Sequence, residues 1–448
     1  MLYIEPSNRT QLSMMNCLED LVSPENPVRL IDILIEKIVK SNQEHFGEER
    51  QSNVGRPKYR ASTFLKLYLY GYLQGISSSR KLETETHRNI EVIWLLGKLQ
   101  PDHWVISNYR KENGATIKLV TKEFRRFLQK SGYIKGKTII IDGTKIKANT
   151  KRDMLTISKI ESRLEKMDSK LEEYFSKLIE NDTLDEIEER NGNEFDYGEI
   201  NRELLDKLVK LQKKMEELHS AKKYLEDEER NHVSLADKEA RLMRSLDGHI
   251  PGYNAQIAVD EENKMLADSE VVTDENDLNQ IKPMVESIEE EIGEKPEEVI
   301  ADKGYYNPHL IEELETDGKV ECFVSVPNKK KEEITFEYNK EKDEYECSEG
   351  KILLLKQRNK KKRNGLADVY QGIECTGCKM REKCTKAKNG RMIHRYHNHD
   401  WLENYKKKMN GFIAKGKIKK RKTIVEHPFG TIKNWMGKIP LLLRGKEI

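Results

Sequence analysis

The sequence predicts an α/β protein in which an all-helical N-terminal domain precedes a mixed sheet with two insertions. Short apolar β-type runs within residues 138–142, 257–272, 299–302 and 320–326 surround one helical segment. Helical periodicity dominates the first 132 residues, and residues 153–232 and 328–400 differ in composition from the strands around them. We therefore expect a helical domain over 1–132 and an α/β domain over 133–448 with those two insertions.

Four helical segments are expected in the N-terminal domain. Ser23-Pro24-Glu25 reads as a cap before the first of them, and Gly75 ends the second. Ser77–Ser79 can cap a further helix at Arg80, and a basic helix should run from about Asn108 to Lys130. Short helices with tight turns and basic side chains are typical of a helix-turn-helix-like DNA-binding module, and an ordinary helical bundle is the alternative. Its candidate DNA contacts are Arg56, Lys58, Arg60, Arg110 and Lys111.

Charge is distributed unevenly along the chain. The 448 residues include 80 Lys and Arg against 78 Asp and Glu, a formal net charge of only +2. Nine Lys and Arg and no acid lie between Lys406 and Lys422, six basic residues lie in Lys356–Arg363, and the acids concentrate between Glu161 and Glu229. This asymmetry favours polyanion binding on one face, with plain solvated surface as the alternative.

Cellular context follows from two further features. No apolar run approaches the length of a membrane span, and the N-terminus lacks a signal-peptide core, which predicts a cytoplasmic protein. The six cysteines are then expected to be thiols or metal ligands rather than disulfides.

The first insertion has the apolar spacing of two long helices. Apolar residues recur in steps of three and four on either side of the polar stretch NGNEFDYGEIN. We expect an antiparallel coiled-coil hairpin over Lys159–Glu229, separate from the core. The two apolar sets are Ile157, Ile160, Leu164, Met167, Leu171, Tyr174 and Leu178, and Leu204, Leu208, Leu211, Met215, Leu218 and Leu225.

The mixed sheet is assembled from segments that flank this hairpin. We expect a strand at Thr138–Asp142, a two-stranded unit over Ile257–Val272 with its turn at Glu261-Glu262-Asn263, and a helix over Gln280–Gly293. Strands at Val299–Asp302 and Val320–Val326 follow.

Three carboxylates have related settings. Asp142 and Asp302 end apolar β-type runs, and Glu426 opens a segment of helical character. Acidic side chains where buried strands emerge suit a site for hard cations with oxygen ligands, which is the chemistry of phosphoryl transfer on nucleic acid. A turn or capping role is the alternative for each aspartate taken alone.

Four cysteines form a second candidate site. Cys347 is followed by Cys375, Cys378 and Cys384 in a C-x2-C-x5-C arrangement, which suits a closed structural Zn²⁺ site of zinc-ribbon type. Reduced buried thiols are the alternative. His394, His397 and His399 lie close enough in sequence for a ligand swap, and Cys17 and Cys322 are expected in the core.

Four blocks in this order, IIIDGTKIKAN, PGYNAQIAVD, VIADKGYYN and VEHPFGTIKNW, resemble the DDE transposases of bacterial insertion sequences, of the group numbered eleven-eighty-two. The block GRPKYRASTFLKLYLYG resembles the N-terminal domain of that family. The resemblance implies a ribonuclease-H-like core in which Asp142, Asp302 and Glu426 bind two Mg²⁺ or Mn²⁺ ions. It also implies phosphate contacts from Lys433, seven residues after the glutamate, and from Lys422 or Arg421, where the family has arginine.

The implied function is metal-dependent cleavage and strand transfer at the terminal inverted repeats of an insertion sequence. Double-stranded DNA, both element ends and target site, would be the partner, with a homo-oligomer forming on it. The alternative is a catalytically impaired DNA-binding remnant. Relatives commonly continue into a further apolar helix, whereas this chain ends 22 residues after Glu426, so we expect reduced stability and activity. A stand-alone nuclease is a third option that would not need the N-terminal module.

Overall fold

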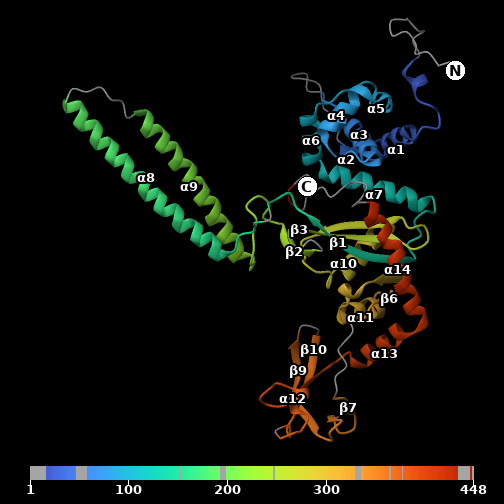
Figure 1. Cartoon of the computed structure of the whole chain (residues 1–448). Coiled ribbons are helices and arrows are strands. Elements are labelled where there is room, and N and C mark those ends of the chain that lie inside the picture. Colours follow the sequence, from blue (N-terminus) through green and yellow to red (C-terminus); the bar gives the residue numbers. More distant parts are fainter. Residues whose placement is uncertain are drawn as a thin grey trace, which may run out of the picture. The chain divides into compact units, whose positions relative to one another are not determined.

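The computed structural model divides into two compact units, one formed by Met1–Phe127 and one by Leu128–Phe429, with short C-terminal segments assigned to each (Figure 1). It describes residues 17–46, 58–151, 153–191, 198–245, 248–327, 334–362, 365–375, 377–431 and 444–445. Within these ranges the first unit is helical, and the second contains two sheets and a long helical hairpin.

The helical unit is built around a compact apolar core. Its helices are η1 (Leu18–Leu21), α1 (Pro27–Ser41), α2 (Gln43–Phe46), α3 (Ala61–Leu73), α4 (Ser79–Arg88), α5 (Ile90–Leu95), α6 (His103–Glu112) and α7 (Gly114–Lys130). Ile35, Leu67, Leu82 and Ile106 are almost completely buried in this core. The cap of α1 is Asn26, whose side chain accepts a hydrogen bond from the Val28 N–H at 3.0 Å, and not the expected Ser23-Pro24-Glu25.

The prediction of one basic helix over Asn108–Lys130 is wrong, because the helix is interrupted at Asn113. This residue ends α6 with a non-helical ψ of 37°, and its side chain donates to the Tyr109 carbonyl at 2.9 Å. Asn and Gly are common where helices end, and the Asn113-Gly114 pair combines them. Two helices therefore replace one.

The larger unit has a six-stranded mixed sheet in the order β2-β3-β1-β5-β6, with β4 also paired to β3. Strand β3 pairs antiparallel with β1, β2 and β4, whereas β5 pairs parallel with β1 and β6. The expected mixed sheet is confirmed, and so is its two-stranded antiparallel unit, formed by β3 and β4. Strand β2 is an additional strand. The strands are β1 (Thr138–Lys147), β2 (Arg241–Ser245), β3 (Gly248–Asp260), β4 (Leu266–Val272), β5 (Glu298–Ala301) and β6 (Glu321–Val324).

Strand β1 is longer than its apolar run. It continues to Lys147 because β3 extends opposite it, pairing Gly143 with Gln256 and Lys147 with Gly252. Asp142 consequently lies inside the strand and opposite Ile257, not at the strand end that the sequence suggested.

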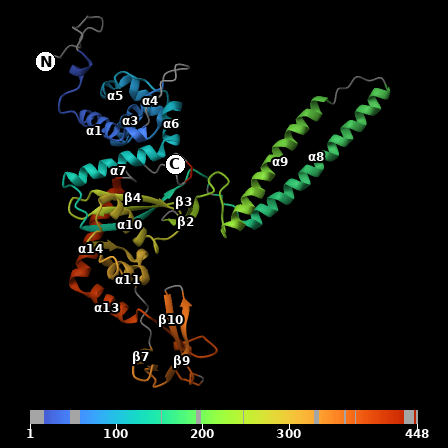
Figure 2. The same ribbon diagram turned by 180° about the vertical axis from the view of Figure 1, so that it is seen from behind.

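Four helices of this unit contribute to the sheet's core: α10 (Ile281–Ile292), α11 (Pro308–Thr316), α13 (His399–Asn410) and α14 (Phe412–Gly430) (Figure 2). The predicted helix over Gln280–Gly293 is confirmed, with Gly293 at a φ of 88° as its C-cap. Side chains such as Ile281, Ile311 and Ile424 pack with the buried strand residues Ile140 and Val299. A short 3₁₀ turn, η2 (Lys303–Tyr305), connects β5 to α11.

The first insertion is a helical hairpin of α8 (Ile157–Asn191) and α9 (Gly198–Asp227). Glu161, early in α8, pairs with Lys222, late in α9, at 2.6 Å, so the helices run antiparallel. Leu164 and Leu225 belong to an apolar cluster that is separate from the core of the mixed sheet. Leu155 and Val233 exchange two backbone hydrogen bonds of 2.8 and 2.9 Å at its base.

Deleting the hairpin should leave the mixed sheet folded. Removing residues 157–231 and bridging the gap with a short glycine linker keeps the paired residues Leu155 and Val233. Since the hairpin's apolar cluster is separate, we expect the melting temperature of the sheet to change by no more than about 4 °C, the size of a ~1 kcal/mol effect in a domain of this size. Thermal unfolding followed by near-ultraviolet circular dichroism measures this, and loss of the whole unfolding transition would contradict it.

The second insertion contains a five-stranded antiparallel sheet in the order β11-β10-β9-β8-β7. Its strands are β7 (Phe336–Asn339), β8 (Glu344–Cys347), β9 (Ile352–Lys362), β10 (Gly365–Gly372) and β11 (Met392–Tyr396), and a short helix, α12 (Arg381–Cys384), precedes β11. Tyr345, Leu353 and Tyr370 form its small core. Across both units, no helix among the described residues has the length and apolarity needed to cross a membrane.

Candidate active site

Strand register brings Asp142 and Asp302 together. Parallel strands β1 and β5 pair Ile139 with Val299 and Ile140 with Ile300. Asp142 and Asp302 lie two residues after Ile140 and Ile300, so the register places the two carboxylates side by side at the point where β5 ends and β1 continues. Asp302 also caps η2, where its Oδ1 accepts a hydrogen bond from the Gly304 N–H at 2.6 Å.

The electrostatics of Asp142 are those of a crowded carboxylate. Its side chain is 22% exposed, and this burial is the largest cause of a pKa raised above the usual aspartate value. The charge of Asp302 raises the pKa further, whereas Arg421 and the Gly143 N–H, which donates to Asp142 Oδ1 at 3.0 Å, lower it. A carboxylate whose ionisation is disfavoured by burial and by a neighbouring acid is an arrangement that a divalent cation would relieve.

Helix α14 places a positively charged side chain, Arg421, beside Asp142. The Arg421 guanidinium, 11% exposed, lies 3.1 Å from Asp142 Oδ2. Two more ion pairs join the same helix to the sheet, from Lys420 to Glu261 at 3.0 Å and from Lys417 to Glu298. Helix α14 is therefore fastened along the strands that present the two aspartates.

Glu426 has a different position from the one expected. It lies near the end of α14 and not at a helix start, because the helix already begins at Phe412. Ile424 and Val425 on this turn are buried in the core, whereas Glu426 is exposed. Nowhere in the described ranges do three or more His, Cys, Asp or Glu side chains form a group arranged to hold a metal ion. Residue Lys433, the expected phosphate contact, lies outside the described residues.

Polar residues that sequence reasoning missed lie beside the two aspartates. Asp277 accepts hydrogen bonds from Asn254 and Gln256, and Tyr305, three residues after Asp302, donates to Gln256. The sequence does contain one signal for this cluster. Asn254 and Gln256 are two amides at positions i and i+2 of a mostly apolar strand, which places both side chains on the same face of the sheet.

The candidate DNA-binding residues of the helical unit differ in exposure. Lys58, Arg60 and Lys111 are exposed. Arg110 is buried, its two terminal nitrogens each donate to the Ser77 carbonyl at 3.2 Å, and its guanidinium lies over the Tyr68 ring. Its place is thus in the packing of α6. Arg56 lies outside the described residues, and Lys422 of α14 is exposed.

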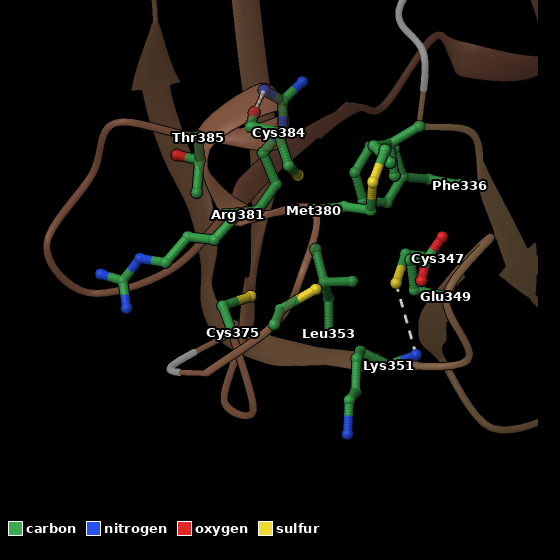
Figure 3. Close-up of a pocket in the computed structure, with 13 residues that line it drawn as sticks. Phe336, Cys347, Glu349, Lys351, Leu353, Cys375, Met380, Arg381, Cys384 and Thr385 are labelled. Atoms are coloured by element: carbon green, nitrogen blue, oxygen red, sulfur yellow. Dashed lines mark hydrogen bonds between the residues drawn. The ribbon is translucent and has the colours of Figure 1, made fainter.

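The four cysteines of the candidate zinc site, Cys347, Cys375, Cys378 and Cys384, line one pocket in the second insertion (Figure 3). Cys347 comes from the end of β8, Cys375 and Cys378 from the loop after β10, and Cys384 from α12. The Cys347 Sγ accepts a hydrogen bond from the Lys351 N–H at 3.3 Å. Burial raises the pKa of the Cys384 thiol, and the other three cysteines raise it further. All six cysteines are free thiols, with Cys322 buried as expected and Cys17 exposed against expectation.

Comparisons with known proteins agree with the resemblance seen in the blocks. Residues 16–112 match the family described as a transposase domain (DUF772), and residues 237–447 match the family described as a transposase DDE domain. Neither a curated protein nor a solved structure gives a significant match.

These two matches define a class of metal-dependent, DNA-cleaving enzymes. Within that class, the chain belongs to the DDE transposases of the insertion-sequence type. Its function is transposition, and DNA is therefore its partner.

Proposed function

We propose that this transposase cleaves and joins DNA strands at the terminal inverted repeats of its own insertion sequence, using Asp142, Asp302 and Glu426 to hold divalent metal ions. The observation that supports this most strongly is the register of β1 and β5, which places Asp142 and Asp302 side by side. The raised pKa of Asp142 adds a physical reason for a cation there. Carboxylate oxygens are the ligands that Mg²⁺ and Mn²⁺ prefer.

The core proposed for this site is ribonuclease-H-like. Its support is the mixed sheet itself, in which β1 pairs antiparallel with the long hairpin strand β3 and parallel with β5. Helices α10, α11 and α14 contribute side chains to the same apolar core. Such a sheet gives a rigid base from which carboxylates project.

Divalent ions bound here would activate the attacking water or 3′-hydroxyl and stabilise the leaving oxygen. Asp142 and Asp302 hold their oxygens in fixed directions, since one is set by its strand and the other by its cap on η2. Arg421 offsets the negative charge of Asp142 before DNA binds, and its guanidinium suits a phosphate contact afterwards. Lys422 and Lys433 are proposed as further phosphate contacts.

Glu426 is proposed as the third carboxylate. Helix α14 is fastened beside Asp142 through Arg421, and Glu426 follows five residues later, about 7.5 Å further along the helix axis. Its exposed position leaves it accessible to solvent and to an incoming metal or DNA strand.

Recognition of the element ends is assigned to the helical unit and to basic surface of the larger unit. Lys58, Arg60 and Lys111 are exposed on the first. We propose the hairpin of α8 and α9 as the element that pairs two protomers, each with one DNA end, in a homo-oligomer. A heptad-type coiled coil would serve this purpose.

The direct test is a cleavage assay on DNA that includes the sequences flanking the gene, with Mg²⁺ or Mn²⁺ present. Matched inverted repeats in those flanks, cut at their ends by the wild-type protein, would support the proposal. Binding without any cleavage by the wild-type chain would instead favour a DNA-binding remnant.

A structural Zn²⁺ ion is proposed for the cysteine pocket. Four thiols from three segments face one pocket, and a backbone N–H already bonds to Cys347 Sγ, as expected of an outer-shell contact to a thiolate ligand. The ion would join β8, the loop after β10 and α12 beside the small apolar cluster of Tyr345, Leu353 and Tyr370. Its role would be structural and independent of DNA cleavage.

We expect one equivalent of zinc in the protein purified without chelator. Elemental analysis measures it directly. Replacing Cys375 and Cys378 by Ser should remove the metal and lower the stability of the second insertion, whereas Cys17→Ser, a change to an exposed thiol outside the pocket, should leave the zinc content unchanged. Metal-free protein with the second sheet folded would show instead that the thiols are simply buried and reduced.

A further inference from the structure

A buried hydrogen-bonded network joins the segments that bear the two aspartates. Asp277 Oδ1 accepts hydrogen bonds from Asn254 Nδ2 at 2.7 Å and Gln256 Nε2 at 2.8 Å, and Lys145 Nζ lies 3.3 Å away. The Tyr305 hydroxyl donates to Gln256 Oε1. Lys145 lies three residues after Asp142, and Tyr305 lies three residues after Asp302. The network therefore connects both carboxylate segments through Asp277 and Gln256.

The network is enclosed by the protein core. Asn254, Gln256 and Tyr305 are fully buried, and the N–H and O–H groups of their side chains would be costly to bury without these acceptors. Lys145 and Asp277 are mostly covered, with 16% and 22% of their side chains exposed. An ion pair and three amide or hydroxyl hydrogen bonds buried at one place define a single arrangement of the groups.

Gly143 lets the network approach β1 directly. A Cβ atom at this position would lie 2.6 Å from Gln256 Nε2, 2.9 Å from Asp277 Oδ1 and 3.1 Å from the Tyr305 hydroxyl. Side chains alternate across a strand, so the network packs on the face of β1 opposite to the one that Asp142 takes. It supports from behind the strand that positions this carboxylate.

The same network reaches the turn that follows β5. A Cβ atom at Gly304 would lie 2.9 Å from Asp302 Oδ1 and 3.4 Å from Asp277 Oδ2, so both carboxylates lie within 3.4 Å of one point. Asp277 is thus close to Asp302 as well as bonded to the residues beside Asp142. Gly143, directly after Asp142, and Gly304, two residues after Asp302, are the places where Asp277 makes this approach.

We infer that Asp277, Gln256 and Tyr305 are positioning residues of the catalytic site, which hold Asp142 and Asp302 at the separation that divalent metal binding needs. This inference rests on the proposed assignment of Asp142 and Asp302 as metal ligands. The three residues do not themselves bind the metal. They fix β1 and the η2 turn relative to each other, and Asp277 adds a negative charge, paired with Lys145, behind the site.

Tyr305→Phe tests the network with the smallest change. It removes the hydroxyl that donates to Gln256 and keeps the ring that fills the core. Because partners behind metal ligands contribute about 10-fold or more to metal affinity, we expect the Mn²⁺ dissociation constant of the full-length, DNA-free protein to rise by about that factor. Isothermal titration calorimetry with Mn²⁺ measures it, and the half-saturating Mn²⁺ concentration for DNA cleavage should rise in parallel. Asp277→Asn should have an effect of the same direction.

Tyr405→Phe is the matched control. Tyr405 is buried in the same core, and its hydroxyl bonds to the backbone of Val324 on β6, donating to the carbonyl at 3.2 Å and accepting from the N–H at 2.9 Å. If Tyr405 has only a structural role, the Tyr405→Phe protein should be less stable than the wild type but should bind Mn²⁺ with the same affinity. Measuring melting temperature and Mn²⁺ affinity together therefore separates positioning from general stability.

Measurements on these variants distinguish the positioning role of the network from the proposed metal site itself. If Asp142→Asn and Asp302→Asn abolish Mn²⁺ binding while Tyr305→Phe and Asp277→Asn bind it like the wild type, the network inference is overturned and the proposed site stands. If the two aspartate variants bind Mn²⁺ normally, the proposed metal site itself is wrong. Weakened binding in the network variants, but not in Tyr405→Phe, supports both.

Discussion

Asp302→Asn is expected to reduce Mg²⁺-dependent cleavage of the element ends by about 1000-fold or more and to leave DNA binding unchanged. The amide keeps the size of the side chain and an oxygen that can accept from the Gly304 N–H, so the η2 turn should persist. What is lost is one of the two negative charges that the register places side by side. Metal ions supply several kcal/mol of transition-state stabilisation, and each ~1.4 kcal/mol corresponds to a factor of ten in rate.

The measurement combines a strand-cleavage assay with an electrophoretic mobility shift on the same DNA. Asp317→Asn is the matched control, since it makes the same chemical change at an exposed position after α11. Cleavage that persists in Asp302→Asn at the wild-type rate would remove Asp302 from the catalytic set.

Arg421→Ala is expected to lower cleavage about tenfold, most strongly at acidic pH. Arg421 lowers the pKa of Asp142, which burial and Asp302 raise, so its removal raises that pKa further. A carboxyl with a higher pKa takes up its proton at a higher pH on acidification, and a protonated carboxyl cannot bind the metal. The acidic limb of the activity profile should therefore move to higher pH, and the deficit should narrow as pH rises. Loss of a charged partner worth about 1.5–3 kcal/mol gives the size of the effect.

Two variants separate charge from packing in this experiment. Arg421→Lys keeps a positive charge and should restore part of the acidic activity. Lys420→Ala breaks a neighbouring ion pair between α14 and Glu261 without changing the surroundings of Asp142, and its pH profile should match the wild type. An unchanged acidic limb in Arg421→Ala would mean that the guanidinium does not tune Asp142.

Much of the larger unit could be predicted because its patterns are local. Gly293 and the apolar spacing before it defined α10, and the polar turn at Glu261-Glu262-Asn263 located the junction of β3 and β4. The proximity of Asp142 and Asp302 followed from a resemblance, and the register of β1 with β5 now gives it a physical basis.

The features that were missed depend on contacts between distant segments. Strand β1 extends past its apolar run only because β3 continues opposite it. Asp277 lies in a polar loop whose composition resembles any surface loop, and its relation to Gln256 and Tyr305 appears only when the strands pair. The start of α14 at Phe412 was hidden because its basic, Gly-containing sequence shows no clear apolar face.

The ion pairs of α13 and α14 reduce the positive charge that the basic run from Lys406 to Lys422 has available for DNA phosphates. Of its nine Lys and Arg, five pair with acids of the same chain within the described residues, namely Lys406, Lys408, Lys417, Lys420 and Arg421. A side chain already neutralised inside the protein displaces few counterions when a phosphate arrives. The dependence of DNA affinity on salt should therefore report a smaller effective charge for this run than its composition suggests. Four of the nine side chains, those of Lys408, Lys417, Lys420 and Arg421, attach α13 and α14 to acids of the mixed sheet and its β3–β4 turn.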